Sequence, residues 1–506
     1  MSGTDLAVGA PERLHPLYLV TGLGRGLRQM IGGYAAIGYL AATGSWRLAL
    51  LMLVGIAAVM IIGVFLYWRR FEFRVGANEI RIDSGIVNRT HRSIPFDRIQ
   101  DVDISQGPLA RLLGLARVKL ETGGSAGDKA DDGALAAIAL SRAEALRDQV
   151  RARRLAAVGS SAADPTTIAP TEPPPVFAMD GRRVLLAGLF NFSLAVIAAL
   201  FGATQTIGDV AGFDFFARRF WREALDAGSP LADLILAHQV AAGLAGTVLL
   251  LVLGLATGVS RTVLRDYRFR LDRTGTGLRR RRGLLTLTDV TVPVRRVQAA
   301  IIGSGPLRDH FGWSELKLQS LAKDEGAKGD HVVAPLARRD EIAAILGELE
   351  WRPVGPSIEW SSISPVYAWG FTAGVGLLLV PVFIQSLVMP WVGAAGTLVV
   401  AALIATRWLS WRRFRYALDG DRLLVRSGWW RRRELILPLA SIQSADVTEN
   451  IFGRRLGTAS LTLGVASGRG YSSHGIPAVK RAIARTLRDK VLAPYACAGR
   501  LPPTAE

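Results

Sequence analysis

The sequence predicts an α+β membrane protein with six transmembrane helices in three hairpins, each hairpin followed by a strand-rich domain that a helix closes. Three observations lead to this fold class. The 506 residues combine a positive mean hydropathy of +0.27 with a formal net charge of +19. Long uncharged stretches alternate with strongly basic ones. The polar segments between the uncharged stretches repeat three times, so a chain of this length is expected to hold several domains.

The uncharged stretches are long enough to cross a bilayer, whose hydrocarbon core of about 30 Å needs roughly 20 helical residues. They cover residues 29–46, 48–68, 184–208, 234–260 and 360–406, and the last stretch is long enough for two helices with a turn near residues 386–391. We therefore expect transmembrane hairpins at residues 29–68, 183–260 and 366–409, with an external loop at residues 209–233 in the second hairpin.

Arginines at the ends of these stretches predict the orientation. The second, fourth and sixth spans end in arginines, namely Arg69 and Arg70, Arg261 and Arg265, and Arg407, Arg412 and Arg413. The loop at residues 209–233 holds five acidic residues against three arginines. Since basic residues favour the cytoplasmic side, both termini and all three polar segments are expected in the cytoplasm. Residues 1–28 are then a cytoplasmic lead before an uncleaved first span.

The three polar segments align without gaps. Each holds a glycine, a proline, a glutamine and a second glycine in that order, and the spacings between them are identical in all three copies. These positions are Gly85, Pro95, Gln100 and Gly114, then Gly283, Pro293, Gln298 and Gly312, then Gly428, Pro438, Gln443 and Gly457. Three coincident sets of spacings identify an internal repeat.

Within each repeat, apolar and polar residues alternate with the period of a strand. The first glycine of each repeat is expected at positive φ in a hairpin turn. Each repeat closes with a helix, which is expected to bury Ile342, Ile345, Leu346 and Leu349 in the second copy, and Val479, Ile483, Leu487 and Val491 in the third, with Pro477 in its first turn. The domains then cover residues 69–157, 261–350 and 410–495, with linkers at 158–182 and 351–365 and a tail at 496–506.

The P-x-x-x-[IV]-Q motif with a downstream glycine, placed after each two-helix hairpin, resembles the bacterial pleckstrin-homology-like (YdbS-like) integral membrane family of the YdbT type. The stretch Arg13-Leu14-His15-Pro16-Leu17 is also similar to the start of that family, and the resemblance covers residues 13–492. It implies PH-like domains of two antiparallel sheets closed by a C-terminal helix, in a multi-pass protein of the bacterial cytoplasmic (inner) membrane. It implies no activity, because such folds bind lipids, peptides and proteins alike.

The sequence offers no catalytic pattern, so the protein is predicted not to be an enzyme. We find no Walker lysine, and the match to the G-x-S-x-G nucleophile pattern at residues 123–127 falls in a polar Gly-rich loop of the first repeat. The chain has one cysteine, Cys497, and six scattered histidines, which predicts neither a metal site nor a bound cofactor.

The basic residues gather beside the membrane, in the first strands of each repeat. Two clusters there are candidates for contact with anionic lipid or a partner, namely Arg279, Arg280, Arg281 and Arg282, and Trp429, Trp430, Arg431, Arg432 and Arg433. Three interpretations remain open: general attraction to an anionic membrane surface, a specific headgroup site, and docking of an acidic protein. Nucleic acid is not expected, because the basic stretches face the bilayer.

Two functions fit these features. The first is a non-enzymatic scaffold in the cell envelope, whose PH-like domains bind or assemble at the membrane. Its partner would be a smaller single-PH-like-domain membrane protein of the same family, or another copy of this chain. The alternative is a lipid-handling or small-molecule transporter or export component that uses the six spans, with Pro381 and Pro390 around a helix break.

Overall fold

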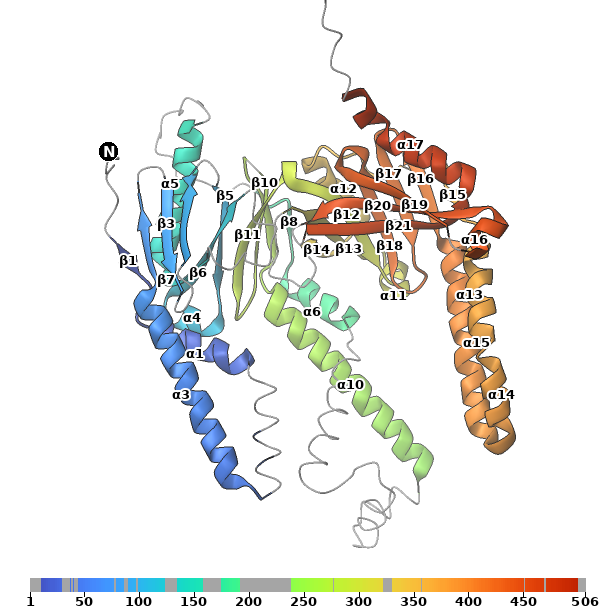
Figure 1. The fold of residues 1–506 in the computed structure, drawn as a ribbon, viewed down its shortest axis with the longest axis horizontal. Helices are drawn as coiled ribbons and strands as arrows, with labels where there is room; N and C mark the ends of the chain where they lie inside the picture. Colours follow the sequence, from blue (N-terminus) through green and yellow to red (C-terminus); the bar gives the residue numbers. More distant parts are fainter. Residues whose placement is uncertain are drawn as a thin grey trace, which may run out of the picture.

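The computed structural model describes residues 11–29, 37, 40, 44–76, 79–85, 90–96, 99–122, 134–157, 174–191, 238–275, 277–321, 330–355, 357–449, 451–467 and 470–498. These residues form three units of one design, set side by side in a row (Figure 1). In each unit a short strand leads into helices that leave the sheets. The chain then returns to form two antiparallel sheets and a closing helix.

The bounds of the elements follow this design. Unit 1 (residues 11–157) holds β1 (Glu12–Arg13), α1 (Tyr18–Gln29), α3 (Trp46–Arg70), β2 (Glu72–Val75), β3 (Glu79–Ser84), β4 (Thr90–Pro95), β5 (Ile99–Gln106), α4 (Pro108–Leu112), β6 (Leu115–Thr122), β7 (Ala134–Ala139) and α5 (Leu140–Ala157). Unit 2 (residues 174–349) holds β8 (Phe177–Ala178), α6 (Gly181–Phe190), α10 (Gln239–Asp266), β9 (Arg270–Arg273), β10 (Gly277–Arg282), β11 (Leu287–Pro293), β12 (Val297–Ser304), α11 (Pro306–His310), β13 (Ser314–Ser320), β14 (Asp330–Ala337) and α12 (Arg339–Glu348). Unit 3 (residues 361–498) holds β15 (Ser361–Ser362), α13 (Val366–Gly376), α14 (Leu379–Val388), α15 (Pro390–Arg413), β16 (Arg415–Asp419), β17 (Arg422–Ser427), β18 (Arg432–Pro438), β19 (Ile442–Thr448), α16 (Ile451–Leu456), β20 (Thr458–Ser467), β21 (Gly470–Lys480) and α17 (Arg481–Ala498).

The local predictions for turns and closing helices are largely confirmed. The turn glycines Gly85, Gly283 and Gly428 have φ values of +106°, +117° and +75°. The four residues predicted to line α12 are all buried. In the third copy the prediction is partly wrong, because β21 runs to Lys480 and contains Pro477, so the helix starts later. Its buried face therefore includes Ala484, while Ile483 is exposed.

A short strand before the helices of each unit pairs with the strand that follows them. Glu12 pairs with Phe73, Phe177 with Leu271, and Ser361 with Tyr416, each antiparallel. The segments expected as a lead and as linkers thus add one strand each to the sheets. Because the paired strands flank the helices, the chain leaves and re-enters each unit at neighbouring points of the same sheet.

The sheets of neighbouring units merge. Strand β5 of unit 1 pairs with β11 of unit 2, which gives a seven-stranded sheet in the order β7-β6-β5-β11-β10-β9-β8. Strand β12 of unit 2 pairs with β18 of unit 3, which gives a second sheet in the order β14-β13-β12-β18-β17-β16-β15. We call these two junctions seam 1–2 and seam 2–3. The three domains therefore form one continuous array, which the sequence analysis did not predict.

The two seams differ in chemistry. At seam 2–3 the strands of unit 3 have apolar residues on both faces: Leu423 packs in the core of unit 3, whereas Leu424 and Ile436 pack in the core of unit 2. In the repeat alignment, Arg279 of unit 2 stands where Leu424 stands in unit 3. Charged side chains accordingly close seam 1–2, whereas at seam 2–3 apolar side chains of unit 3 also enter the core of unit 2.

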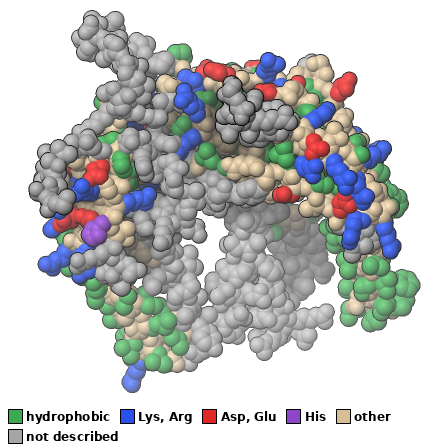
Figure 2. Space-filling model, turned by 45° about the horizontal axis from the view of Figure 1, so that its top comes forward, with side chains coloured by type: hydrophobic (Ala, Val, Ile, Leu, Met, Phe, Trp, Pro, Cys, Tyr) green, Lys and Arg blue, Asp and Glu red, His purple; other side chains and the backbone are tan. Residues whose placement is uncertain are grey.

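Four described helices are long and apolar enough to cross a membrane, namely Trp46–Arg70, Leu244–Asp266, Val366–Val388 and Pro390–Arg413. They correspond to the second, fourth, fifth and sixth predicted spans, and α13, α14 and α15 form a hairpin. They project from one side of the row of units, opposite to α17 (Figure 1). Apolar side chains gather on the projecting helices, and charged ones lie over the sheets (Figure 2).

Other predictions fall on residues outside the described ranges. The first predicted span, residues 29–46, is described only in part. The third, residues 184–208, is described up to Asn191, where α6 has ended. The loop at residues 209–233 lies wholly outside the described part. The turn expected near residues 386–391 lies at Met389, between α14 and α15 and between Pro381 and Pro390, and a further interruption falls at Leu377 and Leu378, between α13 and α14.

Candidate functional site

The four arginines of the first predicted cluster lie in β10 and contact groups within the chain. Because side chains alternate across a strand, Arg279 and Arg281 lie on one face and Arg280 and Arg282 on the other. Arg280 is fully buried and donates a hydrogen bond to the carbonyl oxygen of Val332 (3.1 Å). Arg281 donates to Asp272 (3.0 Å) and Arg282 to Asp266 (2.9 Å), the buried last residue of α10.

Arg279 belongs to a charge cluster that closes seam 1–2. Its Nε lies 2.7 Å from Oδ1 of Asp289, and Arg147 of α5 reaches the other carboxylate oxygen at 2.8 Å from the neighbouring unit. Burial alone would raise the pKa of Asp289, but the hydrogen bonds and charges of Arg279 and Arg147 outweigh it and hold this pKa below its usual value. The cluster therefore joins the units electrostatically.

The second predicted cluster lies in the turn between β17 and β18 and in the first two residues of β18. Trp429 and Trp430 pack edge to face with ring centroids 5.5 Å apart, and Trp430 is 59% exposed. Arg431 and Arg433 are exposed. Arg432 instead forms an ion pair with Asp309, which lies in α11 of unit 2. This hairpin thus exposes the indole of Trp430 and the guanidinium groups of Arg431 and Arg433. Arg432 instead strengthens seam 2–3.

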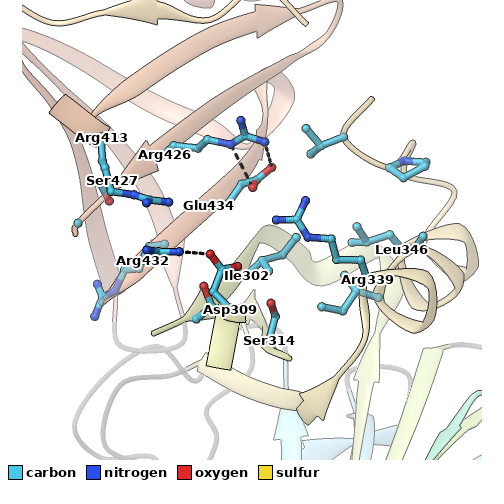
Figure 3. A pocket seen from close by; sticks show the side chains of 17 residues that line it. Ile302, Asp309, Ser314, Arg339, Leu346, Arg413, Arg426, Ser427, Arg432 and Glu434 are labelled. Carbon is cyan, nitrogen blue, oxygen red and sulfur yellow. Dashed lines mark hydrogen bonds and ion pairs between the residues drawn. The ribbon is translucent and has the colours of Figure 1, made fainter. Parts of the chain in front are cut away.

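Seam 2–3 contains a cleft of about 320 Å³, shown in Figure 3. Its walls come from α12, β12 and α11 of unit 2, and from α15 and the β17–β18 hairpin of unit 3. Five arginines and two carboxylates line it, namely Arg339, Arg413, Arg426, Arg432, Arg433, Asp309 and Glu434. The ion pairs Arg432–Asp309 and Arg426–Glu434 (3.2 Å for the latter) use both carboxylates.

The other three arginines of the cleft, Arg339, Arg413 and Arg433, form no ion pair with the described residues. All three are exposed, and Arg413 is the last residue of α15, a candidate membrane span. Arg433 also acts on His474: burial lowers the pKa of this histidine, and the nearby Arg433 charge lowers it further. The cleft is therefore a positively charged hollow beside a membrane helix, suited to an anionic group.

The short helices α4, α11 and α16 carry a feature that the sequence analysis missed. Each follows the first strand of a second sheet, and each exposes apolar side chains. Leu112 is 84% exposed, Leu307 66% and Leu456 59%. Phe311, just after α11, contacts Phe190 of α6 (ring centroids 6.0 Å apart). The three leucines stand at different positions of the repeat alignment, so the spacing that identified the repeats gave no signal for this surface.

The described residues show no group of three or more His, Cys, Asp or Glu side chains placed to hold a metal ion. The Nε2 atom of His474 in unit 3 lies 2.9 Å from Oε1 of Gln319 in unit 2. Its partners Gln319 and Ser472 are a structural hydrogen-bond cluster between units 2 and 3.

Comparison with known proteins agrees with this architecture. The family model described as "Bacterial PH domain" matches residues 29–154, 231–351 and 375–494. The UPF0699 transmembrane protein YdbT of Bacillus subtilis (strain 168) is 21% identical over 467 residues, which cover 88% of this chain and 90% of that protein. The UPF0699 transmembrane protein YdbS of the same organism is 36% identical over 83 residues, 16% of this chain and 46% of that protein. The three matched ranges confirm the repeat predicted from glycine and proline spacing, and the chain belongs to the bacterial PH domain family as a membrane protein with three copies of the domain.

Proposed function

We propose that this chain is a non-enzymatic integral membrane scaffold, whose three PH-like domains form one binding and assembly platform at the cytoplasmic face of a bacterial inner membrane. The observation that carries the proposal is the continuous sheet array. It fixes three domains relative to one another and places a basic cleft at a seam between two of them. In this proposal the chain crosses the membrane six times, and both termini are cytoplasmic.

Helix packing supports a hairpin in units 2 and 3. A Cβ atom on Gly188 of α6 would lie 2.6 Å from Val259 of α10. In unit 3, a Cβ on Gly393 of α15 would lie 2.2 Å from Ser386 of α14. Small residues at such crossings let apolar helices approach closely, as in membrane bundles.

The spacing of tryptophans in α3 and α15 supports a position of these helices across the bilayer. Trp46 and Trp68 lie near opposite ends of α3, and Trp391 and Trp408 lie near opposite ends of α15. At about 1.5 Å per residue these separations are about 33 Å and about 26 Å, close to the thickness of a hydrocarbon core. Tryptophan prefers the two interfaces of a bilayer, so both helices fit a spanning position.

The cleft supports binding of an anionic group, and lipid headgroups are the nearest source. Arg413 ends a candidate span, so the cleft opens beside the expected headgroup layer. Trp430 and the exposed leucines of α4, α11 and α16 would sit in the same layer as apolar anchors. An acidic surface of a partner protein, for example a smaller PH-like membrane protein of the same family, is the other ligand that fits these charges.

The helix break in unit 3 favours the scaffold over the transporter. The break exposes Leu377 and Leu378, and apolar side chains offer no ligands to a polar substrate. The described helix ends that adjoin the sheets are basic, which fits anchoring of the domains at the inner surface.

Topology is tested with reporter fusions. Fusions after Arg70, Arg265 and Arg413 should all report a cytoplasmic position, and a fusion after Phe213 should report an external one. A cytoplasmic result after Phe213 would contradict the six-span arrangement and with it the placement of the domains.

Lipid binding is tested by measuring the lipids that copurify with the full chain in mild detergent. The double variant Arg339→Gln/Arg433→Gln removes two charges from the cleft. At about 1 kcal/mol per basic residue near an anionic surface, anionic lipid should fall roughly 30-fold at low salt. The control Arg485→Gln/Lys490→Gln removes two exposed charges from α17, on the side away from the apolar helices, and should change nothing.

Lysine replacements then separate the two modes of binding. If Arg339→Lys/Arg433→Lys keeps the anionic lipid, general electrostatic attraction is sufficient. If lysine fails at constant charge, the guanidinium forks make a specific headgroup site. Equal loss in the cleft variant and in the α17 control would contradict a role of the cleft, and loss of a copurifying protein in place of lipid would identify the partner as a protein.

A further inference from the structure

The two seams use the same strand register. At seam 1–2, Gln106 pairs with Leu287, Ser105 with Thr288, and Ile104 with Asp289. At seam 2–3, Ser304 pairs with Arg432, Gly303 with Arg433, and Ile302 with Glu434. When the repeats are aligned on their glycines, these are three identical pairs of positions. One mode of domain joining therefore occurs twice in succession.

Each end of the described array presents one half of such a seam. Strand β4 occupies in unit 1 the place of β11 and β18, and it is the outermost strand of its sheet. Strand β19 occupies in unit 3 the place of β5 and β12, and it is outermost in the described part of its sheet. Outer strands keep one row of backbone hydrogen-bonding groups available for another strand. The two ends are thus complementary to each other.

The side chains at the two ends are polar where the seams are buried. Ser93 is exposed, whereas Ile436, its equivalent in unit 3, is fully buried. Asp446 of β19 is exposed too. Extending the seam register across the ends sets Asp446 opposite Arg92 and Thr448 opposite Thr90. Opposite charges on facing strands stabilise a pair, so the ends match in charge as well as in register.

We propose that copies of this chain join head to tail, with β19 of one copy paired antiparallel to β4 of the next in the seam register. This rests on the proposed scaffold function and names the chain itself as its partner. The apolar helices of all units project from one side, and repetition of one seam keeps those of the next copy on the same side. A heterologous contact of this kind builds rings or filaments, here within one membrane.

The polar character of the ends suits such a contact. Each end strand must stay soluble while the copies are apart, and charged residues on an outer strand prevent indiscriminate pairing. Confinement of both copies to one membrane raises their effective concentration, so a short strand pair is sufficient for association. Because the register fixes which side chains face one another, each end strand pairs only with the strand whose side chains match.

Cysteine cross-linking in native membranes tests the register. In a Cys497→Ala background, Thr90→Cys/Thr448→Cys should give a ladder of disulfide-linked dimers, trimers and larger species on mild oxidation. Each single cysteine should give no ladder, because only two sites per chain can propagate one. The off-register pair Thr90→Cys/Gln443→Cys, five residues away, should give at least about tenfold less cross-linked product.

Charge exchange tests the same contact independently. Asp446→Arg and Arg92→Asp should each suppress the ladder of the cysteine pair, and the double exchange should restore it. Lipid copurification should stay at the wild-type level in Asp446→Arg, so failure of the array and failure of the lipid-binding scaffold are read separately. Absence of the ladder, an equal ladder off register, or cross-linking of position 448 to a different polypeptide would overturn the proposal.

Discussion

Replacing Gly283 by alanine should destabilise unit 2 much more than replacing Gly312 by alanine. Both glycines have positive φ, +117° and +72°, so both substitutions carry a backbone cost of about 1–2 kcal/mol. At Gly312 nothing lies within 4 Å of the added Cβ. At Gly283 the Cβ would lie 1.9 Å from the carbonyl oxygen of Thr286, a backbone atom of the same turn.

The turn must therefore open in Gly283→Ala, which adds about 2–3 kcal/mol of overpacking strain. The expected losses are about 3–5 kcal/mol for Gly283→Ala and about 1–2 kcal/mol for Gly312→Ala. Urea-dependent pulse proteolysis of the full chain in detergent, followed at cleavage sites in unit 2, measures both. With a denaturant dependence of about 2 kcal/mol per molar, the midpoints should fall by about 2 M and by less than about 1 M.

Membrane insertion serves as the control, since both variants should still fractionate with the membrane. Equal midpoints for the two variants would show that the β10–β11 turn relaxes without cost. The positive φ and the close approach to Thr286 would then not determine the stability of this hairpin.

Three further predictions concern the seams. Asp289→Asn should cost about 1–3 kcal/mol at neutral pH. Because the native pKa of Asp289 lies below its ordinary value of 3.8, its contribution is full above that value and is lost as the pH falls through the native pKa; hydrogen exchange in β11 measures both effects. The native pKa of His474 lies below its ordinary value of 6.5. Its contribution to the stability of unit 3 is therefore full above pH 6.5 and falls as the pH decreases below that value. The urea midpoint of the wild type should fall between pH 7 and pH 5 for this reason, and His474→Gln should remove this part of the fall. Ile436→Ala should cost about 2–5 kcal/mol and increase proteolysis in units 2 and 3 together, whereas Leu437→Ala, whose side chain packs in the core of unit 3, should affect unit 3 alone.

Local features of the fold follow from the sequence because single residues impose them. Glycines at fixed spacing mark turns that need positive φ, and all three predicted turn glycines have it. Alternation places Ile80 and Ile82 in the core of unit 1, as the strand period requires. The start of α17 was misplaced, because Pro477 suits both a first helical turn and a strand that ends at Lys480.

The seams could not be predicted, because composition does not record which strand a given edge will meet. Two-residue strands such as β8 are also too short to show any period. The sequence made the arginines of β10 candidates for contact with anionic lipid or a partner, since a run of four arginines resembles a juxtamembrane cluster. A hairpin register with its turn at residues 283–287, centred on Leu285, sets Asp289 opposite Arg281, as the structure does. That register would have indicated that acidic residues of the same chain lie beside the arginines of β10.

The cleft depends on long-range assembly. Arg339 and Arg413 are distant in the sequence and belong to different units. They meet only because seam 2–3 joins those units. Arg433, by contrast, was among the residues predicted from sequence, since it lies in a hairpin next to two tryptophans.

Hydrogen exchange of the full chain, diluted in detergent so that copies are separate, tests the continuous array most directly. In an antiparallel ladder, alternate N–H groups of a strand bond to each of its two neighbours. The residues that pair across the seams, Leu287–Asp289 of β11 and Arg432–Ile436 of β18, should therefore be protected without alternation, as in β10 and β17. The outer strand β4 should exchange about half of its N–H groups rapidly, since it has one neighbour in the described structure. Rapid exchange of half the amides in β11 and β18, as in β4, would show that the seams are absent and that the three domains are separate.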